Sequence, residues 1–327
     1  MEAFIALLNP MLMLFICMAI GYALTRSGVM PKRGAAVLSK SVTWIFAPSL
    51  SFITMARSFT LESLERGSAL FIIGLIVGII STLISIPIGM ALAGKKELRG
   101  VFMYGLALGN MGYLGDPIVL SLFGDEVLVY YKLFTLPMTV IIYTWGVAML
   151  VPGDKGKKSV FRRLVNMPLI ATVIGLIVGI TGLGELLPEF LNVTFDSLKV
   201  CLGPVAMIVA GMTVAGYSVR ELVKNTRVYI TTGLKMLVYP FIMCGIVFLF
   251  KLLFESVLKV PLGNGVFYFA FFAFACPLGL NTVVYPESYG GDSRPGASMA
   301  IISNTLAVIS MPLLYTLLVE IVGPLAL

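Results

Sequence analysis

Residues 109–117 read GNMGYLGDP, and they interrupt a run of apolar residues long enough to cross a membrane. The stretch brings three glycines, one proline, one amide and one carboxylate into sequence that otherwise predicts the middle of a hydrocarbon layer. Proline removes a backbone hydrogen bond and glycine weakens a helix, so a continuous helix is not expected here. Backbone groups freed in lipid cost several kcal/mol each unless they face protein or a water-filled cavity. We therefore expect a functional site at this interruption.

The composition is that of an integral membrane protein. Of the 327 residues, 59% are hydrophobic and only 12% are charged, and the mean hydropathy is +1.01. Histidine is absent and the four cysteines form no CxxC pair, so we expect no metal site, no disulfide and no cofactor. No basic tract is interleaved with aromatic residues, which argues against nucleic acid as a partner. The expected surroundings are a lipid bilayer.

Ten membrane spans are predicted, because a helix needs about 20 apolar residues to cross the hydrocarbon core. The connections between them are short, so no soluble domain is expected. The predicted limits are 3–24, 36–56, 68–93, 100–122, 127–151, 167–184, 197–216, 228–250, 265–286 and 297–320.

The orientation follows from the placement of positive charge. The odd-numbered connections carry most of the 23 lysines and arginines, whereas the even-numbered connections and both ends carry few. The positive-inside rule therefore predicts that the odd-numbered connections are cytoplasmic. Both termini are then on the non-cytoplasmic side of a multi-pass membrane protein, which requires an even number of spans.

An internal repeat relates the two halves of the chain. Five spans per repeat is an odd number, so the halves have opposite topology, which is typical of secondary transporters. We assign 1–151 to the first repeat, 152–166 to a cytoplasmic connection and 167–327 to the inverted second repeat. The matching landmarks are Pro10 and Pro168, Pro48 and Pro204, Asn110 with Pro117 and Pro277 with Asn281, and Pro137 and Pro312.

The ninth predicted span repeats the anomaly of the fourth, since residues 275–282 read ACPLGLNT. If both spans unwind near mid-membrane, their breaks can cross and point two half-helix N-termini at one place. Such ends attract anions, and Asn110 and Asn281 add amide donors without a buried charge. The alternative is two kinked helices whose amides bond to local carbonyl groups. We also assign Gly112, Tyr113, Gly279 and Thr282 to substrate binding, and Pro117 and Pro277 to the breaks, with packing an equal alternative for Tyr113.

Asp116 is the only acidic residue that we place away from a membrane interface. A carboxylate at this depth is expensive and is by default a functional hypothesis. It can take up a proton, coordinate Na+ as a coupling ion, or pair with a lysine. The alternative is that the span ends earlier and Asp116 is solvated near the outer surface.

Other polar residues lie within predicted spans. Lys235 is about two turns deep in the eighth span, where it can be the partner of Asp116 or attract an anionic substrate. Asn304 in the tenth span has a similar depth and can either join helices or line the site. Lys40, Lys132 and Lys199 lie nearer span ends, and we expect their ammonium groups to reach towards the interface.

These motifs together resemble the auxin efflux carrier family, which includes plant PIN proteins and bacterial malate or malonate permeases. The resemblance extends over essentially the whole chain. The matching motifs are NMGYLGDP at 110–117, CPLGLNT at 276–282, WIFAP at 44–48 and LKMLVYP at 234–240.

The resemblance implies an elevator-like fold related to the bile acid sodium symporters. Spans 1, 2, 6 and 7 would form a scaffold and the interface of a homodimer, and spans 3–5 and 8–10 a moving transport domain. The substrate carboxylate would bind where Asn110 and Asn281 take the asparagine positions of the family. The chain lacks the long cytoplasmic loop of the plant carriers, which favours a bacterial inner-membrane protein. Asp116 stands where many relatives are expected to have a neutral residue.

The sequence therefore predicts a secondary transporter of a small organic anion, coupled to Na+ or H+ or uncoupled, rather than an enzyme. A membrane sensor that binds the same ligand without moving it is one alternative. An intramembrane aspartyl protease is another, because Leu114-Gly115-Asp116 resembles a catalytic loop. That chemistry needs two carboxylates that share a proton, and no second acid is expected at membrane depth.

Overall fold

The computed structural model describes residues 2–31, 33–151 and 166–326. Within these ranges all regular secondary structure is helical, apart from one isolated bridge between Gly109 and Leu278. The sequence-based prediction of an all-α membrane protein is confirmed.

In the first half of the chain some helices continue into one another through short π-helical segments, and one 3-10 segment precedes the helix that begins at Arg99. Its elements are α1 (Glu2–Arg26), α2 (Gly34–Ser41), η1 (Val42–Phe46), α3 (Ala47–Ser58), α4 (Leu61–Ala93), η2 (Lys96–Leu98), α5 (Arg99–Ala107), η3 (Met111–Gly115), α6 (Asp116–Ile141), η4 (Ile142–Gly146) and α7 (Val147–Leu150).

The second half begins its described part with a short helix. Its elements are α9 (Met167–Ile180), α10 (Glu189–Ala215), α11 (Val219–Leu222), α12 (Thr226–Gly233), η5 (Leu234–Val238), α13 (Tyr239–Ser256), α14 (Gly265–Ala275), α15 (Asn281–Tyr289) and α16 (Arg294–Val322).

Seven helical stretches in the described part of the chain are long and apolar enough to cross a membrane. The predicted spans 100–122, 167–184 and 265–286 are not among them. The first and last of these are interrupted, and the helix in the middle one, α9, has only 14 residues. The count of ten spans therefore stays a prediction.

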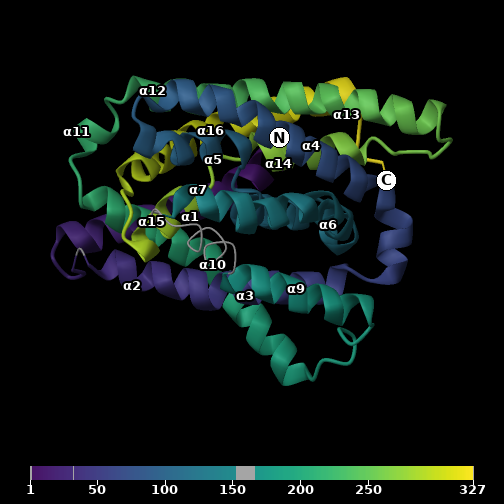
Figure 1. Ribbon diagram of the computed structural model, residues 1–327, viewed down its shortest axis with the longest axis horizontal. Helices are drawn as coiled ribbons and strands as arrows, with labels where there is room; N and C mark the ends of the chain where they lie inside the picture. Colours follow the sequence, from purple (N-terminus) through teal and green to yellow (C-terminus); the bar gives the residue numbers. More distant parts are fainter. Residues whose placement is uncertain (1, 32, 152–165, 327) are drawn as a thin grey trace.

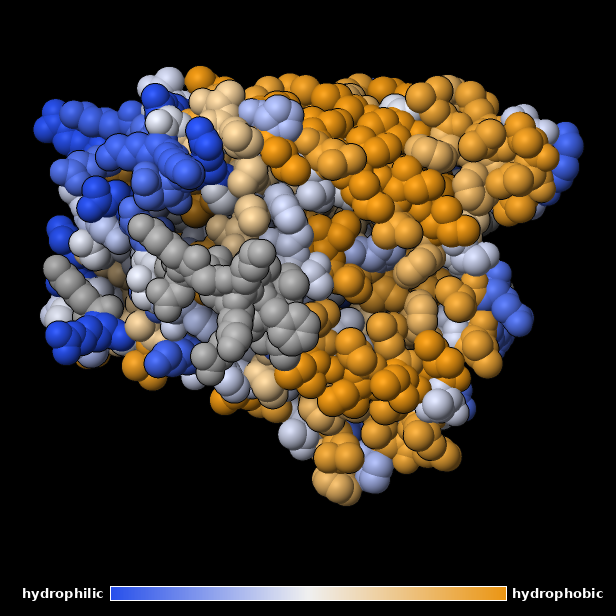
Figure 2. Space-filling model, in the orientation of Figure 1, coloured by the Kyte–Doolittle hydropathy of each residue, from blue (hydrophilic) through white to orange (hydrophobic). Residues whose placement is uncertain are grey.

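The helices pack in two groups. In one group α1 packs along α10, and α3 packs along α9; in the other, α4 packs against α5 and α6, and α13 against α14. Figure 1 shows α2, α3, α9 and α10 along one edge of the molecule, α4, α12, α13 and α16 along the other, and α6 between them. Figure 2 shows hydrophobic residues over most of this length and hydrophilic residues gathered at the end near α11.

Glycines allow α1 and α10 to approach until their backbones touch. A Cβ atom on Gly21 would lie 2.2 Å from the carbonyl oxygen of Ile208, and one on Gly211 would lie 1.9 Å from that of Met18. Small residues at such crossings are the usual basis of helix association in membranes, where lipid supplies no hydrophobic driving force.

We predict that Gly211→Ala lowers the melting temperature by several degrees, because the added methyl group must push two backbones apart at a cost of about 1–3 kcal/mol. The matched control is Gly245→Ala in α13, where a Cβ atom meets nothing within 4 Å. It should leave the melting temperature unchanged or slightly raised. Equal melting temperatures for the two purified variants would contradict this packing.

Candidate substrate site

The two interrupted stretches meet inside the molecule. Between α5 and η3, and between α14 and α15, the chain leaves the helical conformation for a few residues. Gly109 and Leu278 form an antiparallel bridge there, and the backbone N–H of Asn110 donates to the carbonyl oxygen of Pro277 at 2.9 Å. The backbone groups that each break releases are thus partly satisfied by the other break, as a lipid environment requires.

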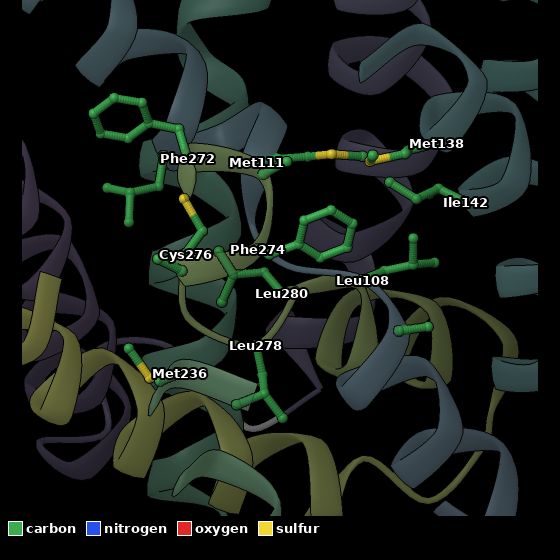
Figure 3. Packing of buried hydrophobic residues seen from close by; sticks show 14 of the residues in the cluster. Leu108, Met111, Met138, Ile142, Met236, Phe272, Phe274, Cys276, Leu278 and Leu280 are labelled. Atoms are coloured by element: carbon green, nitrogen blue, oxygen red, sulfur yellow. The ribbon is translucent and has the colours of Figure 1, made fainter. Parts of the chain in front are cut away.

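Local sequence explains why the breaks fit together. A Cβ atom on Gly109 would lie 3.0 Å from the carbonyl oxygen of Ala273, so a larger residue would require the two segments to shift by a few tenths of an ångström. The N–H of Leu278 donates to the Ser303 hydroxyl of α16 at 3.3 Å. Figure 3 shows apolar side chains around the crossing, including Leu108, Met111, Phe274, Leu278 and Leu280.

A small cavity lies where the two following half-helices begin. Its volume is about 50 Å³, well below the 300–1,000 Å³ typical of sites for small molecules. The N-terminal end of a helix carries a partial positive charge, and both half-helices begin beside this space. In α15 the N–H groups of Thr282 and Val283 donate to the carbonyl oxygens of Gly279 and Leu280 at 3.0 and 2.9 Å. The lining residues are Leu50, Ser51, Thr54 and Met55 of α3, residues 109–113 and 279–281 at the breaks, and Lys132, Thr139, Ile142 and Tyr143 of α6 and η4.

The two asparagines differ in their hydrogen bonds. The Asn281 amide is held by two tyrosines: it accepts from Tyr113 at 2.9 Å and donates to Tyr104 at 2.7 Å. Asn110 is only 3% exposed, and its amide nitrogen has no partner among the described residues. The alternative in which both amides bond to local carbonyl groups therefore does not fit. Asn110 is one of the residues that line the cavity, and its amide nitrogen is a buried donor without a partner among the described residues.

The remaining predicted residues are placed as follows. Gly112 and Gly279 line the cavity, and a Cβ atom on Gly112 would meet nothing within 4 Å. The Thr282 hydroxyl donates to the carbonyl oxygen of Gly279 at 2.9 Å and so shapes the turn before α15. Pro277 lies in the second break, whereas Pro117 lies in the first turn of α6, after the first break rather than in it.

Asn304 does not line the cavity. Its amide donates to the carbonyl oxygen of Ala300 in its own helix at 2.8 Å. The neighbouring Ser303 makes the contact between α16 and the second break instead. A residue one position away therefore takes the joining role that the sequence suggested for Asn304.

Asp116 is buried, not solvated at the outer surface. Its carboxylate pairs with the ammonium group of Lys132, and the two side chains are 12% and 14% exposed. The expectation that Lys132 reaches for the interface is thus wrong, and of the two alternatives for Lys235 the pairing with Asp116 does not hold. Lys132 reaches Asp116 because the chain bends within α6 at Gly124, whose φ is 82°.

Lys235 lies on the other side of the crossing. It is fully buried in η5, with its ammonium group 3.5 Å from the carbonyl oxygen of Ala107 and 5.0 Å from the centre of the Phe274 ring. Both contacts lie at the C-terminal ends of the half-helices α5 and α14, which carry partial negative charge. Among the described residues no carboxylate lies within 4 Å of this ammonium group.

Sequence reasoning missed three lining or supporting residues, namely Tyr104, Tyr143 and Lys132. The tyrosines stand in apolar runs without any distinguishing pattern. For Lys132 a signal existed, because Asp116 and Lys132 are equally far in sequence from Gly124, which lies between the predicted spans 100–122 and 127–151. A hairpin at that glycine places both side chains at the same depth.

Comparison with known proteins identifies the family of the chain. Residues 6–315 match the family described as membrane transport protein. An uncharacterized transporter of Methanothermobacter thermautotrophicus is 27% identical over 243 residues, which cover 73% of this chain and 77% of the relative. An uncharacterized transporter of Methanocaldococcus jannaschii is 26% identical over 215 residues, covering 64% and 69%. The chain belongs to the membrane transport protein family, the family of the auxin efflux carriers that its motifs resemble.

Proposed function

We propose that this protein is a secondary transporter of a small organic anion, whose carboxylate binds in the cavity at the crossing. The observation that carries the proposal is that two half-helices begin at one small cavity, beside Asn110 with its unpartnered buried amide. Together these groups attract negative charge without burying a charge of their own. Membership in a family of membrane transport proteins supports transport over sensing.

The proposed mechanism is an elevator built from ten spans in two inverted repeats. The scaffold consists of α1, α2–α3, α9 and α10, and the transport domain of α4–α7 and α12–α16. Two features support this division. The cavity is lined by α3 on one side and by both breaks on the other. Contacts between the two groups include side-chain hydrogen bonds that can break and re-form with other partners when the groups move. These bonds join Thr43 to Ser288 at 3.3 Å and Thr213 to Glu287 at 3.2 Å.

The size of the cavity fits a closed conformation in this scheme. A volume of about 50 Å³ leaves no room for an organic anion of several heavy atoms. Movement of α3 away from the breaks would enlarge it, since α3 supplies one wall. The substrate would then enter and leave as the two groups of helices shift relative to each other.

Further parts of the proposal rest on charge placement and on the resemblance. Odd-numbered connections are cytoplasmic, both termini are outside, and the protein is a homodimer of the bacterial inner membrane. Coupling to H+ or Na+ involves Asp116. Protease chemistry finds no support, because the carboxylate of Asp116 faces Lys132 rather than a second carboxylate.

The substrate can be sought among mono- and dicarboxylates by thermal shift with and without Na+, because a ligand that binds only the folded state raises its stability. With an identified substrate, we predict that Asn110→Ala lowers uptake into proteoliposomes about 10- to 100-fold, the loss expected for one hydrogen bond to a charged group. The matched control is Asn304→Ala, whose amide is bonded within its own helix. Undiminished uptake by Asn110→Ala, or equal losses in both variants, would contradict binding of the substrate at the crossing.

We predict that Lys235→Met raises the melting temperature and lowers uptake. Methionine keeps the length of the side chain and removes a buried ammonium group that has no full counter-charge among the described residues. Its desolvation should outweigh its contacts with the Ala107 carbonyl oxygen and the partial charges of the helix ends, so the fold should gain about 1 kcal/mol or more. The half-helix C-termini then lose their positive neighbour, and anion binding weakens.

A control lies in the same membrane-spanning stretch. Lys251 pairs with Glu255, so Lys251→Met leaves a carboxylate unpaired and should lower the melting temperature with little effect on uptake. A Lys235→Met protein that melts lower and transports normally would show that Lys235 is purely structural.

A further inference from the structure

The pair of Asp116 and Lys132 depends on a bend in the chain. Both residues belong to α6, and 16 positions separate them. In a straight helix that separation would be about 24 Å. The bend at Gly124 instead brings the carboxylate and the ammonium group into direct contact. The fold thus brings together two buried charged groups that a straight helix would keep apart, which suggests a role for the pair.

The two members of the pair have different access to the cavity. Lys132 lines it together with Asn110 and Gly112, whereas Asp116 does not. The ammonium group of Lys132 therefore has two places for an anionic partner: the carboxylate of Asp116 on one side and the cavity on the other. It is the only lysine or arginine among the lining residues.

We propose that the carboxylate of the substrate and the carboxylate of Asp116 compete for Lys132, and that a proton on Asp116 decides between them. The inference rests on the proposed function and specifies its substrate and coupling ion. The empty site holds an ionised Asp116 paired with Lys132. The loaded site holds a protonated Asp116 and a substrate carboxylate paired with Lys132.

The proton balance is simple. One H+ from solution bonds to a carboxylate oxygen of Asp116 and converts it to a neutral carboxylic acid. Lys132 stays protonated in both states and exchanges one carboxylate partner for another. Release of the substrate reverses the step, since the freed ammonium group favours ionised Asp116. One proton therefore accompanies one substrate anion.

Other polar groups near Asp116 do not replace Lys132 in this exchange. Lys199 of α10 is near enough to act on Asp116 electrostatically, but its ammonium group pairs with the carboxylate of Asp196 at 2.7 Å. The other groups near Asp116 are phenols and a thiol, which ordinarily carry no charge at neutral pH: Tyr131 of α6, Tyr143 of η4 and Cys276 of the second break. Protonation of Asp116 thus chiefly releases Lys132 from its ion pair.

The charge balance specifies a substrate class. With a monocarboxylate, the empty and loaded sites have the same net charge, so the site crosses the membrane at equal electrostatic cost in both forms. A dicarboxylate would leave one negative charge without a partner in a medium where such a charge is costly. The site therefore fits a monocarboxylate that moves together with one proton.

The test is a binding measurement on the purified protein with pyruvate as the monocarboxylate and malonate as the dicarboxylate. Isothermal titration at one pH in buffers of different ionisation enthalpy gives the number of protons taken up per bound anion. For the wild type we expect pyruvate to bind with uptake of one proton. Its affinity should fall about tenfold per unit of pH where Asp116 is ionised in the empty protein.

Three variants separate the roles of the two residues. Asp116→Asn frees Lys132 permanently, so it should bind pyruvate without proton uptake and independently of pH. Lys132→Gln should bind at least tenfold more weakly. The double variant Asp116→Asn/Lys132→Gln should also bind weakly. It leaves neither residue with an unpaired charge, so it can still be measured if Lys132→Gln alone does not fold. Lys199→Gln is the matched control: it removes a positive charge that does not line the cavity, so it should still bind pyruvate with uptake of one proton.

The possible failures are distinguishable. Pyruvate binding by the wild type without proton uptake, or tight binding by the double variant, would overturn the exchange at Lys132 and leave the proposed transport intact. Binding of malonate alone would overturn the monocarboxylate assignment only. Absence of binding for both anions would count against the proposed function itself, and with it this inference.

Discussion

The structure depends on one constraint, which is that backbone released from a helix inside a membrane must find partners within the protein. The chain meets this constraint by pairing two breaks with each other. Gly109 bridges to Leu278, and Asn110 donates to Pro277, so the interruptions in two distant stretches satisfy one another. Neither break would be tolerable alone at this depth. Their contact therefore fixes the relative position of four half-helices.

That contact also separates charge within an apolar interior. The N-terminal ends of η3 and α15 face the cavity, and the C-terminal ends of α5 and α14 face the opposite side. On that side Ser81 donates to the carbonyl oxygen of Ala107 at 2.8 Å, and Lys235 lies nearby. The protein thus places polar groups of its own at the negative ends and a cavity at the positive ends. An anion is the ligand that completes such an arrangement.

Much of this could be predicted from the sequence, since glycine, proline and asparagine are conspicuous in apolar runs. Both interruptions, the burial of Asp116 and the family followed from local composition and the order of motifs. The partners of these residues did not follow, because pairing depends on how distant helices face each other. Tyr104 looks like any aromatic residue of a span until α15 brings Asn281 to it. Lys132 was misplaced because its nearness to a span end was considered without the bend at Gly124.

The central claim is that a carboxylate binds at the N-terminal ends of the two half-helices. Solid-state NMR in bilayers tests it directly, because Met111-Gly112 is the only Met-Gly pair in the chain and can be labelled selectively with 13C-methionine and 15N-glycine. With a substrate labelled by 13C at its carboxylate, the account predicts dipolar coupling between that carbon and the Gly112 nitrogen. A bound, transported substrate that shows no such coupling would contradict it.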